Sequence, residues 1–78
     1  MNAYKQVFDN LVNLEKNIGR KLSPLEFNYI RYMEVEGDPA TYFVRNEVYD
    51  DKRLNLKNIY RKYQEIKQTQ EPKTSNAN

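Results

Sequence analysis

Apolar residues recur at three- and four-residue steps through most of the chain, a period typical of helices with one buried face. The clearest series lies between residues 51 and 68 and consists of Leu56, Ile59, Tyr60, Tyr63 and Ile66. A second series in this stretch, Arg53, Lys57 and Arg61, is spaced four residues apart. It predicts a basic stripe about a quarter turn from the apolar face. Two interpretations are open here: a core helix with a solvated flank, or a nucleic-acid contact.

A helix is also predicted over residues 3–18, where apolar side chains fall on one side. These are Tyr4, Val7, Phe8, Leu11, Leu14 and Ile18. Gly19 follows the last of them and suits the left-handed conformation that commonly ends a helix.

Among the aromatic residues of the chain, those predicted to lie in the core are Tyr4, Phe8, Phe27 and Phe43.

The start of the next helix carries strong local signals. Ser23 is a good N-cap, and Pro24 suits the first helical position because its missing N–H has no intrahelical partner there. Glu26 comes three residues after Ser23 and completes a capping box. The helix is predicted to run to Glu36 and to stop at Gly37.

Asp38 repeats the cap, and Pro39 again follows at the first helical position. The third helix is predicted to run from there to about Tyr49. Its inward side chains are expected to be Ala40, Phe43, Val44 and Val48. After a polar turn, the fourth helix is expected from about Leu54 to Thr69.

Four helices with very short connections predict an all-α fold, a compact bundle-like domain of about four short helices over residues 1–70. Pro72 ends any helix, and the residues after it have no apolar side chain large enough to pack. Residues 71–78 are therefore predicted to form a disordered tail. A chain of 78 residues is long enough for one small domain at most.

Neither cysteine nor histidine occurs in the sequence. Their absence removes thiolate metal sites, the usual general base and the common nucleophile systems. Ser23 is used as a cap, and Ser75 lies in the predicted tail. The carboxylates around the second helix end, Glu34, Glu36 and Asp38, lack the order of a calcium loop. We therefore expect no enzyme activity, no catalytic residue, no cofactor and no metal.

The chain lacks an apolar run near the ~20 residues that span a bilayer. Its first residues also lack the apolar segment of a signal peptide. Together with the absence of cysteine, these features predict a cytoplasmic protein without a membrane partner.

Charge changes sign along the chain. Residues 1–51 carry six Lys/Arg against nine Asp/Glu, whereas residues 52–78 carry seven against two. An acidic body with a basic end suggests a polyanionic partner. Cations near a helix C-terminus are also favoured by the helix dipole. The alternative that these residues only stabilise the helix end therefore stays open.

Seven tyrosines and three phenylalanines are too many to bury in so small a domain. Some tyrosines must face solvent or a partner, and the candidates are Tyr29 or Tyr32, Tyr42 or Tyr49, and the outer part of the Tyr60/Tyr63 pair. Exposed tyrosine beside arginine or lysine suits stacking on unpaired bases. It equally suits a protein–protein hot spot, and composition does not separate the two.

Taken in order, these elements resemble the C-terminal DnaD/DnaB-type domain of Gram-positive and phage primosome proteins. The points of resemblance are the segments NLEKNIGRKLSPLEFNYI and DDKRLNLKNIYRKY, separated by an acidic glycine turn and a third helix. The family tends to end in a Tyr-x-x-x-Ile-x-x-x-Trp helix. Ile59 matches the isoleucine, Tyr63 stands where the tryptophan would be, and Asn55 stands where the tyrosine would be and could instead cap the helix. The resemblance covers about residues 4–68.

The resemblance implies a non-enzymatic DNA replication accessory domain of the primosome assembly or helicase-loading type. It implies binding to DNA, single-stranded or remodelled duplex, and to other replication proteins, with possible homo-oligomers. The residues expected to contact DNA are Arg53, Lys57, Tyr60, Arg61, Lys62, Tyr63 and Lys67. The alternative is a protein–protein interaction or self-association module without direct DNA contact.

Overall fold

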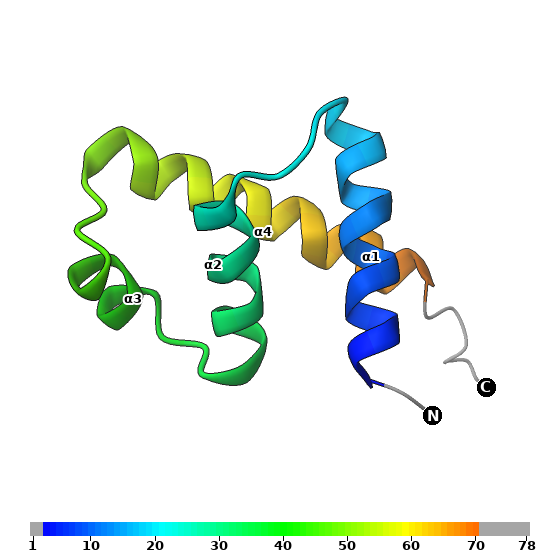
Figure 1. Cartoon of the computed structure of the whole chain (residues 1–78), viewed down its shortest axis with the longest axis horizontal. Coiled ribbons are helices and arrows are strands. Elements are labelled where there is room, and N and C mark those ends of the chain that lie inside the picture. The colour runs from blue at the N-terminus through cyan, green and yellow to red at the C-terminus, as the bar shows by residue number, and fades with distance from the viewer. Residues whose placement is uncertain (1–2, 71–78) are drawn as a thin grey trace. The chain divides into compact units, whose positions relative to one another are not determined.

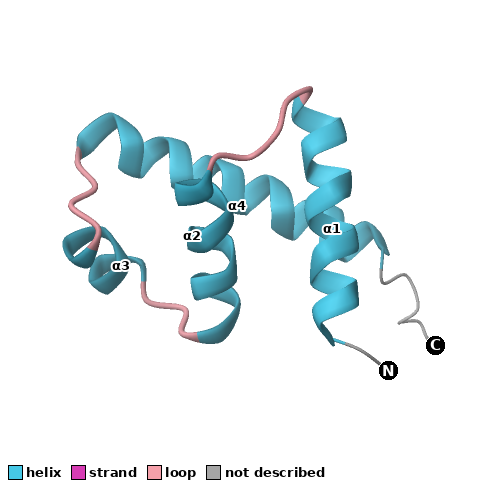
Figure 2. Cartoon of the chain, viewed as in Figure 1, coloured by secondary structure: helices cyan, strands magenta, loops and turns pink. Residues whose placement is uncertain are grey.

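The computed structural model describes the backbone of residues 3–70 and the side chains of residues 5–69. Four helices occur in this part of the chain (Figure 1): α1 Ala3–Ile18, α2 Pro24–Val35, α3 Pro39–Arg45 and α4 Asp50–Gln70. They are joined by short loops, and no strand occurs in the described residues (Figure 2). The all-α class is therefore confirmed. The core position predicted for Tyr4 lies outside the described side chains. The disordered tail predicted for residues 71–78 lies outside the described residues.

Contacts between residues divide the chain into two compact units. The first unit comprises the chain up to Lys21 together with the chain from Lys62 onward, and the second unit comprises Leu22–Arg61. α1 and the end of α4 thus belong to the first unit, whereas α2, α3 and the start of α4 belong to the second. A single domain over residues 1–70 stays a prediction.

In the first unit, α1 buries a narrow face. Asn10, Leu11 and Leu14 are buried, whereas Phe8 is 60% exposed. The core position predicted for Phe8 is wrong, because this residue lies about a third of a turn from the centre of the buried face. The predicted stop is confirmed: Gly19 has a φ of 77°, and its N–H donates to the carbonyl of Glu15 at 2.9 Å.

The capping box that starts α2 is confirmed at atomic detail. The Ser23 hydroxyl accepts from the N–H of Glu26 at 3.2 Å, and the Glu26 carboxylate accepts from the N–H of Ser23 at 2.9 Å. The two bonds satisfy two N–H groups that a helix start leaves without an intrahelical partner. At the other end, Glu36 is the C-cap and Gly37 follows with a φ of 72°, as the sequence predicts.

α3 starts at its predicted cap but is shorter than predicted and turns a different face inward. Its helix ends at Arg45, and Tyr42 and Phe43 are its buried residues, with Val48 buried beyond its end. Val44 is 72% exposed, and Ala40 is exposed as well, so their predicted inward positions are wrong. The reason is size, because burying two aromatic rings removes far more apolar surface from water than burying alanine and valine.

α4 begins four residues before the predicted start. Asp50 and Asp51, expected in a turn, form its first helical turn, where negative charge is favoured by the helix dipole. The predicted apolar face is confirmed, since Leu56, Ile59 and Tyr63 are all buried.

Aromatic residues form the centre of the second unit. Tyr29 lies parallel to the ring of Phe43 with 5.5 Å between ring centroids, and edge-on to Tyr42 at 5.2 Å. Val48 and Leu56 complete this buried cluster. The hydroxyl of Tyr42 donates to the carbonyl of Leu25 at 3.0 Å, so the polar end of a buried ring is satisfied. This cluster fixes α3 and the start of α4 against α2.

Candidate nucleic-acid interface

Two carboxylates of α2 are hydrogen-bonded to uncharged donors of α4. The amide of Asn55 donates to Glu26 at 2.9 Å, and the hydroxyl of Tyr60 donates to Glu34 at 2.7 Å. These bonds join the two ends of α2 to positions five residues apart on α4, all within the second unit. Both carboxylates are thus bonded to α4 by donors that carry no charge, an amide and a phenol.

Glu26 carries a double role that the sequence did not reveal. One carboxylate oxygen accepts from the N–H of Ser23 in the capping box, and the other accepts from Asn55. The side chain is buried, where an unsatisfied carboxylate would be costly. Asn55 therefore bridges two helices from inside α4 and does not cap it, which corrects the alternative drawn from the family pattern.

Arg53, the first member of the predicted basic stripe, is partly used by the fold. Its Nε donates to the carbonyl of Val48 at 2.7 Å, and its guanidinium carbon lies 5.3 Å from the ring centroid of Phe43. The hydrogen bond satisfies a carbonyl in the loop before α4, and the ring contact is a cation–π interaction. Arg53 is half-buried, so the stripe does not begin as a fully solvated cation.

Lys57 and Arg61 continue the stripe as exposed cations. Neither forms an ion pair with another residue of the described chain. The amino group of Lys57 lies 5.9 Å from the ring centroid of Phe43, near the edge of the cation–π range, and is otherwise open to solvent. Because neither cation is paired with a carboxylate in the described chain, these two charges remain available to an anionic ligand.

The structure revises both tyrosines of the predicted interface. Tyr63 has 0% exposure, so a role in stacking on bases is wrong for this residue, and its ring belongs to the core. Tyr60 is half-buried, its hydroxyl is held by Glu34, and its ring packs edge-on against Tyr29 at 6.1 Å. Because both its hydroxyl and its ring are held in this way, Tyr60 has little freedom to turn toward a base.

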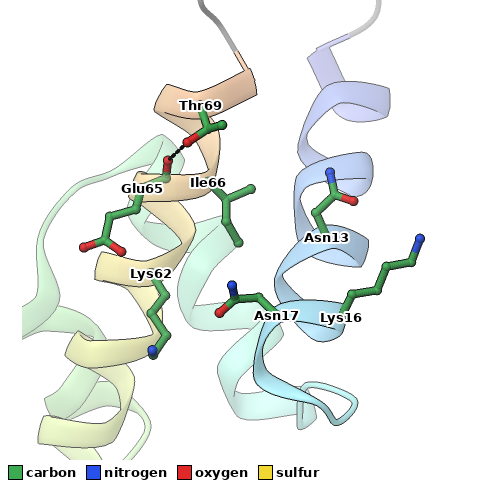
Figure 3. A pocket seen from close by; sticks show the side chains of 7 residues that line it. All are labelled: Asn13, Lys16, Asn17, Lys62, Glu65, Ile66 and Thr69. Carbon is green, nitrogen blue, oxygen red and sulfur yellow. Dashed lines mark hydrogen bonds between the residues drawn. The ribbon is translucent and has the colours of Figure 1, made fainter.

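The remaining predicted contacts, Lys62 and Lys67, lie in the first unit. Lys62 is exposed and Lys67 is half-buried. Lys62 lines an open groove of about 530 Å³ between α1 and the end of α4 (Figure 3), whose other lining residues are Asn13, Lys16, Asn17, Glu65, Ile66 and Thr69. The three α1 residues of this groove were missed, although their spacing of three and four residues was a signal of one helical face.

The net charges of the two units differ from the charge split along the sequence at residue 52. In its described part, the first unit carries six Lys/Arg and three Asp/Glu, a net charge of +3, whereas the second unit carries six and seven, a net charge of −1. The change of net charge near residue 52 in the sequence therefore does not correspond to an acidic unit and a basic unit divided at that residue. α1 itself is neutral, with two Lys and two Asp/Glu, and the excess of the first unit comes from Arg20 and Lys21 after α1 and from Lys62 and Lys67 at the end of α4.

Three pKa shifts accompany these contacts. Burial raises the pKa of Tyr29 above its ordinary value, with the neighbouring Tyr42 as a smaller cause, and burial raises the pKa of Tyr42. At the start of α3, a hydrogen bond from the Thr41 hydroxyl lowers the pKa of Asp38, and the Thr41 N–H adds to the effect. None of the three lies on the basic stripe, so these shifts concern the scaffold.

Comparison of the chain with protein-family models, with curated proteins and with solved structures finds no match. Within the described residues, no helix has the length and apolar character needed to cross a membrane. The same part of the chain contains no cluster of three or more acidic, histidine or cysteine side chains that could hold a metal ion.

Proposed function

We propose that this protein binds DNA through the exposed cations of α4 and serves as a non-enzymatic accessory domain in DNA replication. In this proposal Lys57 and Arg61 contact backbone phosphates, and Arg53 adds a contact with the part of its guanidinium that Val48 leaves open. The replication role rests on the family resemblance of residues 4–68. The DNA contact rests on the site itself.

The observation that carries the proposal is that uncharged side chains of α4 bond to the carboxylates of α2, while the exposed cations of α4 have no ion pair. The carboxylates of Glu26 and Glu34 bond to Asn55 and Tyr60 of α4, and Lys57 and Arg61 form no ion pair within the described chain. The exposed acidic residues in the described part of α4 are Asp50, Asp51 and Glu65, and none of them forms an ion pair with Lys57 or Arg61. Phosphate is the ligand that such unpaired cations bind with least demand on exact geometry.

Binding of this kind is electrostatic and nearly independent of sequence. Phosphate contacts fix position and orientation but do not distinguish bases. With Tyr63 buried and Tyr60 held by Glu34, base stacking by these two rings contributes little. We therefore expect weak affinity that falls steeply as salt is added.

The test is fluorescence anisotropy of a labelled oligonucleotide at about 50 and about 200 mM salt. The double variant Lys57→Gln/Arg61→Gln removes two phosphate contacts and should lower the slope of log affinity against log salt by about 1.4 on a single strand. The matched control Arg31→Gln/Arg45→Gln removes two exposed cations of α2 and α3 from the same unit and should lower it much less. No detectable binding by the parent protein at low salt, or equal losses in the two variants, would reject the proposal.

The second candidate is self-association without DNA contact, and the exposure of Val44 on α3 favours it. Val44 lines a shallow groove with Ala40, Thr41 and Arg45. A second copy that buries this apolar surface would associate in a manner that tolerates salt. Sedimentation equilibrium at the same two salt concentrations distinguishes the candidates. Self-association that Val44→Asp abolishes, together with no oligonucleotide binding, would favour this candidate over the first.

A further inference from the structure

The groove of the first unit presents hydrogen-bond donors from two helices to one space. Asn17 lies near the end of α1, and Lys62 lies on α4. Figure 3 shows the Lys62 amino group and the Asn17 amide directed toward the same side of the groove, with Ile66 between the two helices. Neither Lys62 nor Asn17 forms a side-chain hydrogen bond or ion pair within the described chain. Their donors are therefore available to a ligand.

The chemistry of the lining favours an anion. Glu65 is the only carboxylate among the lining residues, and in Figure 3 its carboxylate points away from the space shared by Lys62 and Asn17. A metal cation would find one carboxylate and two lysines there, which is a poor set of ligands for a hard cation. The surrounding unit has a net charge of +3 in its described part, which raises the local concentration of anions.

The shape of the site narrows the choice among anions. The groove is open to solvent, so it can admit part of a polymer without closing around it. An ammonium and an amide bind phosphate oxygens directly, and the exposed edge of Ile66 offers an apolar contact to the sugar or base that follows. A flexible single strand can enter such a groove, whereas the phosphates of a duplex lie on a stiff rod.

We infer that the first unit contains a phosphate subsite, in which Lys62 and Asn17 bind one backbone phosphate of a single-stranded nucleic acid. This inference rests on the proposed function and deepens it, because it assigns a contact on the unit that does not contain Lys57 and Arg61. Asn13 lines the same groove one turn earlier on α1, and in Figure 3 its amide is directed away from the space shared by Lys62 and Asn17. In Figure 3 the Lys16 side chain extends away from α4, so the subsite is assigned to Lys62 and Asn17 alone.

The experiment measures binding of a labelled single strand of about ten nucleotides to the full chain at low salt. Asn17→Ala removes the amide without adding charge, and alanine favours the helix, so folding should be retained. We expect about a threefold loss of affinity for Asn17→Ala and about a tenfold loss for Asn17→Asp, because the latter places a negative charge beside the phosphate. Lys62→Gln should lower the salt slope by about 0.7.

Gln64→Glu is the matched control, since it adds one negative charge to the same unit through an exposed side chain that does not line the groove. It should change affinity less than twofold. In parallel, the side-chain amide signal of Asn17 in ¹H–¹⁵N spectra should shift saturably on titration with the single strand and shift less with a duplex of the same length.

The outcomes separate the inference from the proposed function. If Lys57→Gln/Arg61→Gln weakens binding while Asn17→Asp behaves like Gln64→Glu, the phosphate subsite is rejected and the proposed function stands. If the parent chain binds no oligonucleotide, both are rejected. If the Asn17 amide responds equally to single strand and duplex, the assignment to a single strand is overturned. Loss of affinity in Asn17→Asp well beyond the control, with the expected amide shift, supports the subsite.

Discussion

The two units of this protein hold similar numbers of cations in opposite surroundings. In the second unit, six Lys/Arg accompany seven Asp/Glu, and α2 uses two carboxylates to hold α4. In the described part of the first unit, six Lys/Arg accompany three Asp/Glu, and two of the lysines line an open groove. The comparison teaches that a count of charges along a chain says little about where an anion can bind. What matters is which charges the fold brings together and which of them are already engaged.

The largest effect is expected from removing the carboxylate that holds the second unit. Glu26→Ala should lower the free energy of unfolding by about 2–3 kcal/mol, because it breaks the capping box and leaves Asn55 without its partner. Urea denaturation measures the change. The exposed carboxylate Glu36 is the control, and Glu36→Ala should cost less than about 0.5 kcal/mol. Equal costs would show that the second unit does not depend on its buried carboxylate.

Arg53 and Lys57 belong to the same basic stripe, but only Arg53 is expected to contribute to the stability of the fold. Arg53→Gln should lower the free energy of unfolding by about 1–2 kcal/mol, since it loses the hydrogen bond to Val48 and the cation–π contact with Phe43. Lys57→Gln, its neighbour in the stripe, should change it by less than about 0.5 kcal/mol. Thermal and urea unfolding of the two variants measure this difference. If Arg53→Gln is as stable as the parent, Arg53 belongs with the solvated cations and the stripe is uniform.

A smaller effect is expected at the other end of α2. Tyr60→Phe keeps the ring but removes the hydroxyl that donates to Glu34, and it should cost about 1 kcal/mol of unfolding free energy. Tyr49, which is exposed, supplies the control variant Tyr49→Phe, for which no measurable change is expected. If the two variants unfold alike, the hydrogen bond between Tyr60 and Glu34 makes no net contribution to the stability of the second unit.

The smallest effect is a dependence of stability on alkaline pH that arises in the second unit. The folded-state pKa of Tyr29 and of Tyr42 lies above the unfolded value near 10, so the unfolded chain releases these protons first. Their contribution is complete below that pH and is lost as the pH rises through the folded-state pKa. Unfolding free energies measured from about pH 8 to about pH 11 should fall less steeply in Tyr42→Phe than in Tyr49→Phe. Identical slopes would contradict the assignment.

Local signals in the sequence predicted the helix boundaries that depend on neighbouring residues. The capping box of Ser23 and Glu26, the left-handed Gly19 and the cap at Asp38 all involve contacts within a few residues, so no knowledge of the fold is needed to find them. The start of α4 was predicted four residues late because aspartate suits a turn and a first helical turn equally well.

The inward faces of short helices were harder to predict, because they depend on which element packs against them. Val44 fits the period of α3, but Tyr42 and Phe43 are buried since α2 offers Tyr29 and the carbonyl of Leu25 as partners. The same reason explains the interface. Spacing alone placed Arg53 with Lys57 and Arg61, and only the fold shows that Val48 and Phe43 engage Arg53 while the other two remain open.

The order of the two units along the chain has a consequence for folding. The chain leaves the first unit at Lys21 and returns to it at Lys62, with the whole second unit between these points. Bringing α1 and the end of α4 together in an unfolded chain requires closing that entire loop, at an entropic cost that prior collapse of the second unit reduces. The second unit is therefore expected to form first, and its folding shortens the loop that must close before the groove of the first unit can form. A chain cut after Arg61 would retain the basic stripe but lose the α4 half of the groove.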